Sequence, residues 1–540
     1  MKSNAEDQPP KKWFTLPGPP QFPERIEHET LGHAFLDQAR QRPNEAVIAD
    51  RISGVKTYRD LLQGIFVLRK EILQFSDEYI GIMMPASVGV NVMYLATMFS
   101  GKIPVMINWT LGRKNLRYCV ESLRIFRILT SRELVQRLQE QGFEIEDLQD
   151  RFIFVEDIRR HLTTADKLSA WRSSRFSWTK LQEVKIPDTA VILFTSGSES
   201  NPKAVPLTHR NILANLVDVF QCLTFYNRDC LLGFLPPFHS FGLTITTLLP
   251  MCFGVRVVYY PNPTHGQTLS EIIEAYGVTI FVSAPSFLES IIRHAHCHRL
   301  SSIRLVITGA EKCPQRIYDM LAQSCPRALL LEGYGVTETS PVISVNDEND
   351  LRPGTIGKTM NSLEYAVVDS ESWARARLNQ PGMLLVRGPS VFGGYLHYDG
   401  PSPFVEFEGK QWYRTGDLVK ENEEKVLTFV AREKRFIKRG GEMISLPAIE
   451  TVLDIHFNDN HHGGPILAVA ASPNAHHPEI VVFTTTDLDR KRINQVIQQE
   501  GLSGLHNVRK VIRLHELPVL GTGKTDYRAL TERLKTQQIS

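Results

Sequence analysis

The stretch from Ala190 to Lys203 combines residue types that can bind phosphate. Its first five residues are apolar and predict a short buried strand, and the hydroxyl-rich sequence TSGSESNP follows at 195–202. Small residues let a loop close around phosphate oxygens, hydroxyl and amide groups donate to those oxygens, and Lys203 adds a positive charge. An ordinary surface turn fits these residues equally well, since Ser, Gly, Asn and Pro dominate turns. The common P-loop is excluded, because Gly-Lys-Ser/Thr does not open the helix that is predicted to begin at Thr208.

Five other segments carry small and polar residues that can contact a ligand. They are Phe238–Gly242, Thr308–Lys312, Leu331–Thr339, Tyr413–Asp417 and Pro518–Lys524. Each has an ordinary explanation when it is taken alone: Glu338 as a surface glutamate, Tyr334 as a packing residue, and His239 as a buried histidine with a structural hydrogen bond. Their joint presence in one chain is the stronger signal. A separate histidine-rich cluster at 294–298 matches no closed metal site and is predicted to be a polar helix end.

Strands and helices alternate along most of the chain and must position these segments. Residues 31–73 predict a helix, a short hairpin and a second helix. The strands predicted after them are Tyr79–Met84, Ile103–Asn108, Ile125–Leu129, Phe152–Val155, Leu231–Leu235, Arg256–Tyr260, Ile280–Ser283, Leu305–Thr308 and Leu329–Glu332. This β-then-α order predicts parallel sheets covered by helices, a class of fold that binds ligands in loops at strand ends.

The pattern changes after about residue 365. Short alternating runs with glycine turns predict a β-rich subdomain, and the charge-dense segment that begins at Arg432 opens a small α+β unit. The fold class is therefore predicted as α/β, with a large N-terminal domain of helix-covered parallel sheets, a β-rich subdomain and a small C-terminal domain. We expect a flexible leader at 1–30, the N-terminal domain at 31–431 and the C-terminal domain at 432–540.

The overall composition limits the function classes. A net charge of +2 gives no bulk attraction to nucleic acid or to a membrane. Seven scattered cysteines without a Cys-x-x-Cys pair favour reduced thiols in a cytoplasmic protein over a disulfide framework. The uncharged run 80–101 and the apolar run 244–260 are interrupted by Pro85 and Arg256, so we predict buried core elements and no transmembrane segment.

In their order and spacing, these motifs resemble the adenylate-forming superfamily of acyl-CoA synthetases, peptide-synthetase adenylation domains and luciferases. The residues that carry the resemblance are the loop Thr195–Lys203, the Tyr-Gly-Val-Thr-Glu element at 334–338, Arg-Thr-Gly-Asp at 414–417, the hinge-like 432–435 and Gly-Thr-Gly-Lys at 521–524. Within the superfamily, the sequence looks most like bacterial acyl-acyl-carrier-protein synthetases. It also resembles the synthetase half of the 2-acylglycerophosphoethanolamine acyltransferases, and we expect the acyltransferase half to be absent.

The resemblance implies a two-step reaction that uses ATP and Mg²⁺. A fatty carboxylate attacks the α-phosphate of ATP to give an acyl-adenylate and pyrophosphate, and a phosphopantetheine thiol then takes the acyl group and releases AMP. The residues it assigns to ATP are Thr195, Ser196, Gly197, Ser198, Gly309, Ala310, Glu311, Gly333, Tyr334, Gly335, Asp417 and Arg432. The residues it assigns to catalysis are Lys524, Lys203, Thr337, Glu338 and His239, with Glu338 also as the Mg²⁺ ligand.

The same resemblance assigns a conformational role to the C-terminal domain. Lys434 matches the hinge about which this mobile domain turns between the two steps, and Gly441 would line the pantetheine tunnel. Lys524 would bridge the attacking carboxylate and the α-phosphate. Ser200 stands where many members have glycine, so the phosphate loop is expected to differ in shape or stiffness.

Several questions stay open at this stage. By the resemblance, the acyl acceptor is expected to be acyl carrier protein, with coenzyme A as the alternative. Charge does not separate the two, because both are anionic and would use the same basic residues. One alternative function is a non-catalytic acyl-nucleotide-binding protein, and another is a kinase or ATPase that releases ADP. The acyl pocket is expected between a helix at Phe241–Leu249 and the strand that ends at Thr308. Chain-length preference, oligomeric state and peripheral membrane contact are not determined by the sequence.

Overall fold

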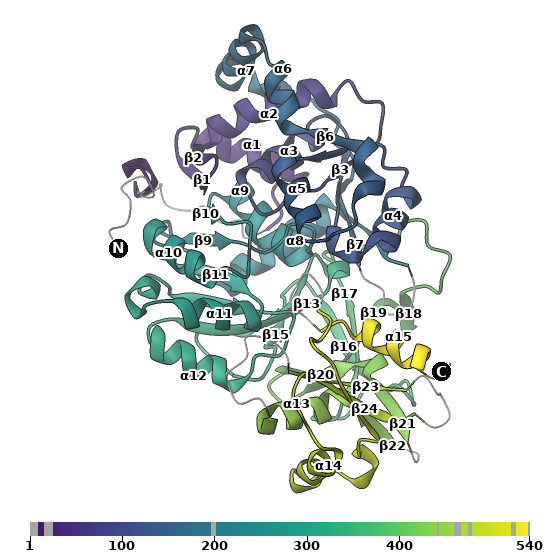
Figure 1. Cartoon of the computed structure of the whole chain (residues 1–540). Coiled ribbons are helices and arrows are strands. Elements are labelled where there is room, and N and C mark those ends of the chain that lie inside the picture. Colours follow the sequence, from purple (N-terminus) through teal and green to yellow (C-terminus); the bar gives the residue numbers. More distant parts are fainter. Residues whose placement is uncertain are drawn as a thin grey trace. The chain divides into compact units, whose positions relative to one another are not determined.

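The computed structural model describes residues 9–15, 25–195, 201–439, 442–457, 466–472, 478–519 and 525–537. The chain forms two compact units (Figure 1). Unit 1 comprises residues 1–365 and 386–413, and unit 2 comprises residues 366–385 and 414–540. The boundaries predicted from sequence at residues 30 and 431 stay predictions.

A nine-stranded sheet forms the larger layer of unit 1. Its strand order is β15-β14-β13-β12-β11-β9-β10-β1-β2, and the strands from β13 to β1 pair in parallel. The antiparallel strands lie at its two edges. The bounds are β1 (Ala46–Asp50), β2 (Gly54–Thr57), β9 (Cys230–Gly233), β10 (Arg256–Tyr259), β11 (Ile280–Ser283), β12 (Leu305–Thr308), β13 (Leu329–Gly335), β14 (Val342–Val345) and β15 (Lys358–Thr359).

A second sheet of unit 1 has the order β6-β5-β3-β4-β7-β8, with only the edge strand β8 antiparallel. Its strands are β3 (Tyr79–Ile82), β4 (Ile103–Met106), β5 (Ile128–Thr130), β6 (Phe152–Phe154), β7 (Thr189–Thr195) and β8 (Lys203–Thr208). The fully buried Val105 and Ile125 belong to its apolar core. The sequence prediction missed β8, because Pro206 lies inside it; proline is tolerated there since the strand is at an edge.

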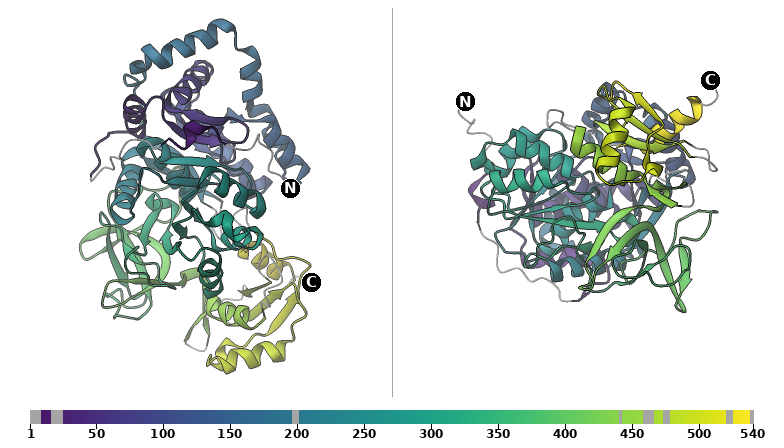
Figure 2. Two further views of the ribbon diagram at one scale, coloured as in Figure 1. Left: turned by 90° about the vertical axis from the view of Figure 1, so that its left-hand side faces the viewer. Right: turned by 90° about the horizontal axis from the view of Figure 1, so that it is seen from below.

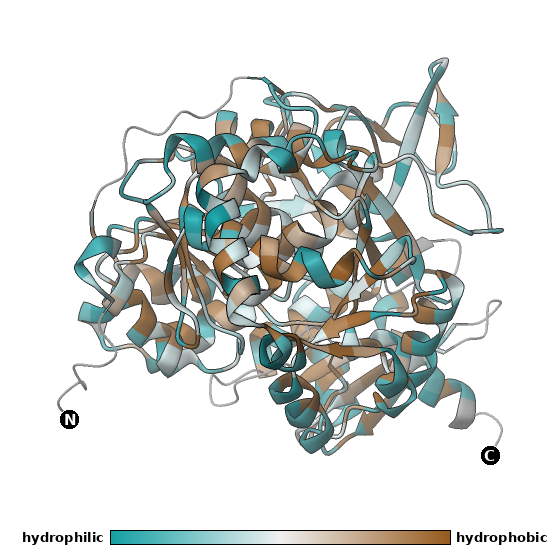
Figure 3. Ribbon diagram, turned by 90° about the horizontal axis from the view of Figure 1, so that it is seen from above, coloured by the Kyte–Doolittle hydropathy of each residue, from teal (hydrophilic) through white to brown (hydrophobic). Residues whose placement is uncertain are grey.

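Helices flank both sheets (Figures 1 and 2). They are α1 (Leu31–Gln41), α2 (Tyr58–Ile72), α3 (Val88–Met98), α4 (Arg113–Ser122), α5 (Arg132–Glu140), α6 (Val155–His161), α7 (Thr164–Phe176), α8 (His209–Cys222), α9 (Leu249–Phe253), α10 (Gly266–Tyr276), α11 (Pro285–His294) and α12 (Gln315–Ser324). The predicted helix start at Thr208 is confirmed, because its hydroxyl accepts from Asn211 N at 3.1 Å as an N-cap. Figure 3 shows helices with both hydrophilic and hydrophobic residues, as expected for elements that cover a sheet.

The predicted β-rich region contains a five-stranded sheet. Its strands are β16 (Glu364–Val368), β17 (Gly382–Arg387), β18 (Phe404–Phe407), β19 (Lys410–Glu421) and β20 (Leu427–Arg432), in the order β16-β17-β19-β18 with β20 also paired to β19.

The C-terminal part of unit 2 has the predicted α+β character. Two β-sheets are formed, one by β21 (Phe436–Arg439) with β22 (Glu442–Ser445), and one by β23 (Leu467–Ala471), β24 (Ile480–Thr484) and β25 (Lys510–Arg513). The helices are α13 (Leu446–Phe457), α14 (Arg490–Gln499) and α15 (Tyr527–Gln537). Its core includes Ile449, Val482 and Ile497, all fully buried.

The predicted α/β class with helix-covered parallel sheets is confirmed. In the segment predicted as a flexible leader, Trp13 is fully buried and its indole donates to Tyr276 O at 3.0 Å. The helix α11 ends at His294, the first residue of the histidine-rich cluster that was predicted to be a polar helix end. None of the described helices combines the length and apolar character needed to cross a bilayer.

Candidate active site

The β7–β8 hairpin positions the predicted phosphate-binding residues at the edge of the second sheet. Thr195, the last residue of β7, pairs directly with Lys203, the first residue of β8. The predicted contacts from Ser196, Gly197 and Ser198 lie outside the described residues. Lys203 therefore lies opposite Thr195 at the end of the hairpin.

Two tyrosine rings surround that ammonium. Lys203 Nζ lies 4.5 Å from the ring centre of Tyr395 and 4.4 Å from that of Tyr398. Both rings sit on a segment held against β8 by the hydrogen bond from Leu396 N to Ala204 O at 3.0 Å. Cation–π attraction to two rings restrains the position of a lysine ammonium. The arrangement therefore holds a positive charge at the hairpin.

Tyr395 also links Lys203 to Glu338. Its hydroxyl donates to Glu338 Oε1 at 2.7 Å, and Glu338 is only 7% exposed. Burial, together with the adjacent carboxylate, raises the pKa of Tyr395 well above its ordinary value, so the phenol stays protonated and continues to donate. Phe392 N donates to Glu338 O at 2.8 Å, which fixes the backbone of the same residue. A cation, a phenol and a carboxylate thus form one connected group.

Thr337 joins this group to the segment that contains His239. The hydroxyls of Ser240 and Thr337 lie 3.3 Å apart, within hydrogen-bonding distance. His239 occupies the turn before a π-helical segment, Gly242–Leu248, where its N–H donates to Pro236 O at 3.1 Å. Its ring packs on Phe238 at 4.7 Å. The helix expected at Phe241–Leu249 is thus largely a π-helix, a rare conformation that often marks functional sites.

The ends of β12 and β13 bring the predicted nucleotide-binding residues together. A Cβ on Gly309 would lie 3.2 Å from Gly333 O and 3.6 Å from Phe241 Cε1, so these segments approach closely. The next residue, Ala310, is exposed and has a left-handed φ of 71°. Tyr334 is half-buried and pairs with Ser344 of β14. The predicted residues lie at the carboxyl ends of two neighbouring parallel strands, where ligands bind in this class of fold. They are Gly309, Ala310 and Glu311 after β12, and Gly333, Tyr334 and Gly335 in β13.

The buried carboxylate of Glu332 makes hydrogen bonds that stabilise this end of β13. Glu332 accepts from the hydroxyl of Tyr318 at 2.6 Å, from Gly354 N at 2.7 Å and from Cys313 N at 3.2 Å. All these donors belong to the protein, so Glu332 is satisfied by the fold. It holds the end of β13 in place.

Asp417 and Arg432 meet within unit 2. They are register partners on β19 and β20, and Arg432 Nε lies 3.1 Å from Asp417 Oδ1. The Asp417 side chain is buried, whereas that of Arg432 is 64% exposed. The other sites predicted in this unit, Gly441, Lys524 and the side chain of Lys434, lie outside the described residues.

The residues present fit a magnesium–nucleotide complex. Glu338 is the one carboxylate in the Lys203 group, and its Oε2 accepts no hydrogen bond from any residue that the structure describes. Mg²⁺ commonly binds one or two protein carboxylates and completes its shell with phosphate oxygens and water. A single oriented carboxylate beside a restrained lysine suits that mode of binding, in which the phosphates of the nucleotide supply further ligands to the metal.

Sequence reasoning missed Tyr395 and Tyr398, and it gave no role to Ser240 within the predicted segment Phe238–Gly242. The only local signal for the two tyrosines is the glycine pair and aromatic spacing of Gly-Gly-Tyr-Leu-His-Tyr at 393–398. That pattern indicates a turn next to packed rings and does not reveal a lysine from a distant hairpin as their partner.

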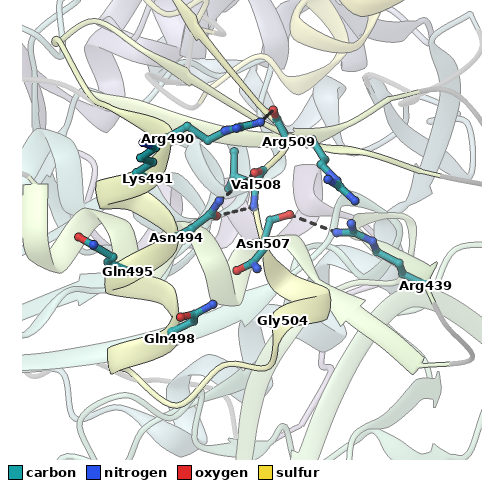
Figure 4. A pocket seen from close by; sticks show the side chains of 10 residues that line it. All are labelled: Arg439, Arg490, Lys491, Asn494, Gln495, Gln498, Gly504, Asn507, Val508 and Arg509. Carbon is teal, nitrogen blue, oxygen red and sulfur yellow. Dashed lines mark hydrogen bonds between the residues drawn. The ribbon is translucent and has the colours of Figure 1, made fainter.

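A polar hollow of about 440 Å³ lies in unit 2 (Figure 4). Four cationic side chains line it, from Arg439, Arg490, Lys491 and Arg509. Four carboxamides, from Asn494, Gln495, Gln498 and Asn507, line it as well, and the lining residues that the structure describes include no carboxylate. Arg439 is anchored by donation to Leu505 O at 2.9 Å and Asn507 O at 3.1 Å. This composition suits an anion.

The fold and the site together define an adenylate-forming enzyme, and the comparisons with known proteins agree. The AMP-binding enzyme family profile matches residues 35–396. The chain therefore belongs to the AMP-binding enzyme family, and it is an ATP-dependent ligase of the acyl-adenylate-forming type.

Particular relatives align with this chain over different lengths. It is 26% identical to a long-chain-fatty-acid–CoA ligase of Bacillus subtilis (strain 168), an alignment that covers 97% of this chain and 98% of that one. It is 30% identical to 4-coumarate-CoA ligase 1 of Narcissus pseudonarcissus over 50% of this chain and 52% of that one. The ATP-bound MatB of Rhodopseudomonas palustris shares the fold at a TM-score of 0.76 and 20% identity, with 94% of this chain and 99% of that one covered.

Proposed function

We propose that this protein activates a fatty acid with ATP and transfers the acyl group to the phosphopantetheine thiol of acyl carrier protein. In the first step a carboxylate oxygen attacks the α-phosphorus, and the bond from that phosphorus to pyrophosphate breaks. In the second step the thiol sulfur attacks the acyl carbon, the bond to AMP breaks and the thiol proton is released. The products are a thioester, AMP and pyrophosphate.

The observation that carries the proposal is the connected group of Lys203, Tyr395 and Glu338. Lys203, restrained by two rings, would neutralise the charge that develops on the departing pyrophosphate. Tyr395 orients Glu338, which would hold Mg²⁺ on the phosphates. When bound, the metal would supply charge neutralisation for the phosphate oxygens. Thr337, tied to Ser240, would contact the α-phosphate.

Unit 2 would supply the remaining groups. Asp417 would accept hydrogen bonds from the ribose hydroxyls, and Arg432 would approach the ribose or a phosphate. Lys434 would act as the hinge of a C-terminal lid that begins near residue 432. Lys524 would reach the carboxylate in the first step, and Gly441 would line the thiol tunnel in the second.

Two observations bear on the acyl acceptor. Acyl carrier protein is favoured by the resemblance of the motifs to acyl-acyl-carrier-protein synthetases, and the hollow lined by Arg439 and Arg509 fits an acidic partner. Coenzyme A is the second candidate, because the Bacillus subtilis relative that aligns over nearly the full length is named a CoA ligase.

Fatty-acid-dependent pyrophosphate exchange tests the first step. We expect exchange that requires ATP, Mg²⁺ and a fatty acid, with AMP as the nucleotide product. Binding of nucleotide without exchange would support a non-catalytic binder instead. Release of ADP would support a kinase or ATPase.

The acceptor is tested by measuring thioester formation at equal concentrations of holo-carrier protein and coenzyme A, across a series of fatty acids. Apo-carrier protein, which lacks the thiol, is the matched control. We expect thioester on the holo-carrier protein, and thioester formed only with coenzyme A would reverse the proposed order.

A further inference from the structure

The helix α7 presents two different faces. Ala170 and Ser174 are buried on the side where α7 packs against α2. Leu168, Trp171 and Phe176 are 64%, 42% and 72% exposed. At about 100° per residue, Leu168 and Phe176 fall on the opposite side of the helix from the buried pair, and Trp171 lies on the flank between Leu168 and the buried Ser174. The chain therefore places large apolar groups on an outward face, which we term the α7 outer face, defined by Leu168, Trp171, Arg172, Arg175 and Phe176.

The aromatic groups of this face are held in place by their neighbours. The Arg175 guanidinium lies 4.2 Å from the centre of the Trp171 ring and donates to Trp171 O at 3.2 Å. The Trp171 and Phe176 rings meet edge to face at 6.4 Å. Side chains already ordered on the surface lose little further conformational entropy when they are buried against a partner.

The charge around the α7 outer face is positive. Residues 155–180 contain six Lys and Arg residues and three Asp and Glu residues. Asp166 is ion-paired with Lys70 at 2.5 Å, and Asp157 with Arg132 at 2.6 Å. Glu156 accepts from Arg132 N at 3.0 Å. Lys167 and Arg172 make no ion pair with any residue that the structure describes, so their charge is available to an anionic partner.

We propose that the α7 outer face docks on an anionic lipid bilayer. Tryptophan and phenylalanine beside cationic side chains are the combination that binds the boundary between headgroups and acyl chains. The helix stays packed on α2, and only its outward side chains enter the lipid. This inference goes beyond the proposed function, and it requires neither adenylation nor a particular acyl acceptor. It would bring a fatty-acid-activating enzyme to the phase in which its substrate accumulates.

Sedimentation of the full chain with lipid vesicles tests the docking directly. The vesicles are phosphatidylcholine with or without phosphatidylglycerol, and no ATP or fatty acid is added, so the result does not depend on activity. The triple variant Leu168→Ser, Trp171→Ser, Phe176→Ser should reduce binding to the anionic vesicles by at least about tenfold. The control variant Ile52→Ser, Leu73→Ser, at positions 79% and 50% exposed in the same unit, should bind as the unaltered chain does.

Charge and depth are tested separately. The variant Lys167→Gln, Arg172→Gln should weaken binding to anionic vesicles by about fivefold per charge and leave binding to neutral vesicles unchanged. Lipids brominated on the acyl chain should quench part of the tryptophan fluorescence, and Trp171→Phe should remove that part while the vesicle binding persists.

Three results would overturn the proposal. The first is a triple variant that keeps the full affinity for anionic vesicles and unfolds at the same temperature as the unaltered chain. The second is equal affinity for neutral and anionic vesicles. The third is a change in the oligomeric state of the triple variant without any change in vesicle binding, which would assign the α7 outer face to a protein partner.

Discussion

At the scale of single residues, Tyr395 connects the two charged groups of the candidate site. Its ring faces the Lys203 ammonium, and its hydroxyl donates to Glu338 Oε1. A phenol that stays protonated can hold a carboxylate in one orientation without neutralising it. Metal binding through the other carboxylate oxygen would then depend on this donation.

The variant Tyr395→Phe keeps the ring beneath Lys203 and removes only the hydrogen bond. A hydrogen bond to a charged group contributes about 1.5–3 kcal/mol, so we expect pyrophosphate exchange to fall by about tenfold or more. The Mg²⁺ concentration for half-maximal rate should rise. Tyr398→Phe is the matched control, because that ring also faces Lys203 but its hydroxyl makes no hydrogen bond with the described residues. Equal rates of pyrophosphate exchange for the two variants would show that the hydroxyl of Tyr395 has no role in the reaction.

At the scale of elements, the turn after β13 depends on the absence of a side chain at Gly335. A Cβ there would lie 2.0 Å from Pro341 O, a backbone atom that cannot move aside alone. The variant Gly335→Ala must therefore displace β13 relative to β14. Because such overpacking typically costs about 1–3 kcal/mol, we expect a lower denaturant midpoint together with weaker ATP binding. Gly393→Ala, where a Cβ would meet no atom within 4 Å, should unfold as the unaltered chain does.

The contact between α1 and α8 predicts a pH dependence of stability. His209, the first residue of α8, is buried, and its Nδ1 accepts from Leu31 N at 3.2 Å, so the folded protein requires the neutral ring. Burial lowers the pKa of His209 to about 4, from an ordinary value of 6.5. Between these values the unfolded chain binds more protons than the folded chain, so stability falls as the pH is lowered.

The loss of unfolding free energy due to His209 is complete near pH 4 and amounts to about 3 kcal/mol at most. Urea unfolding of the full chain at pH 7 and pH 5 should show a smaller loss of stability in His209→Asn, whose amide oxygen can still accept from Leu31. The difference between the two proteins isolates the histidine from other titrating groups. The same slope in both would show that His209 does not titrate on unfolding.

At the scale of the whole molecule, the proposed mechanism divides the work between two units. Unit 1 carries the Lys203 group, and the C-terminal part of unit 2 carries Lys524 in its sequence. If Lys524 serves only the first step, its loss should separate the two half-reactions.

We expect Lys524→Ala to reduce pyrophosphate exchange by about a hundredfold or more, since one preorganised charge at a reacting phosphate has an effect of this size. Thioester formation from added acyl-adenylate should stay near the unaltered rate. Lys535→Ala is the control, because Lys535 lies on the surface of α15 and pairs with Glu532 at 2.9 Å. Equal loss in both half-reactions would contradict a role confined to adenylation.

Much of the fold follows from local sequence. The alternation of apolar strands with amphipathic helices predicted both sheets of unit 1, and the hydroxyl of Thr208 predicted the start of α8. The strand β8 was missed because proline normally argues against a strand, and only its position at a sheet edge makes Pro206 acceptable. The π-helical form of Gly242–Leu248 was also not predicted, because it differs from an α-helix in backbone hydrogen bonding rather than in side-chain pattern.

The sequence by itself determined the chemistry that is present: the hydroxyl loop, the lysine, the glutamate and the strand-end glycines, in the order of an adenylate-forming enzyme. Only the tertiary structure decided which of these groups meet. Lys203 and Glu338 lie in distant parts of the chain, and both contact Tyr395 because β8, the residues after β13 and the 392–396 segment are hydrogen-bonded together. Local patterns report burial and backbone conformation, whereas such contacts depend on the order of strands and on long-range packing.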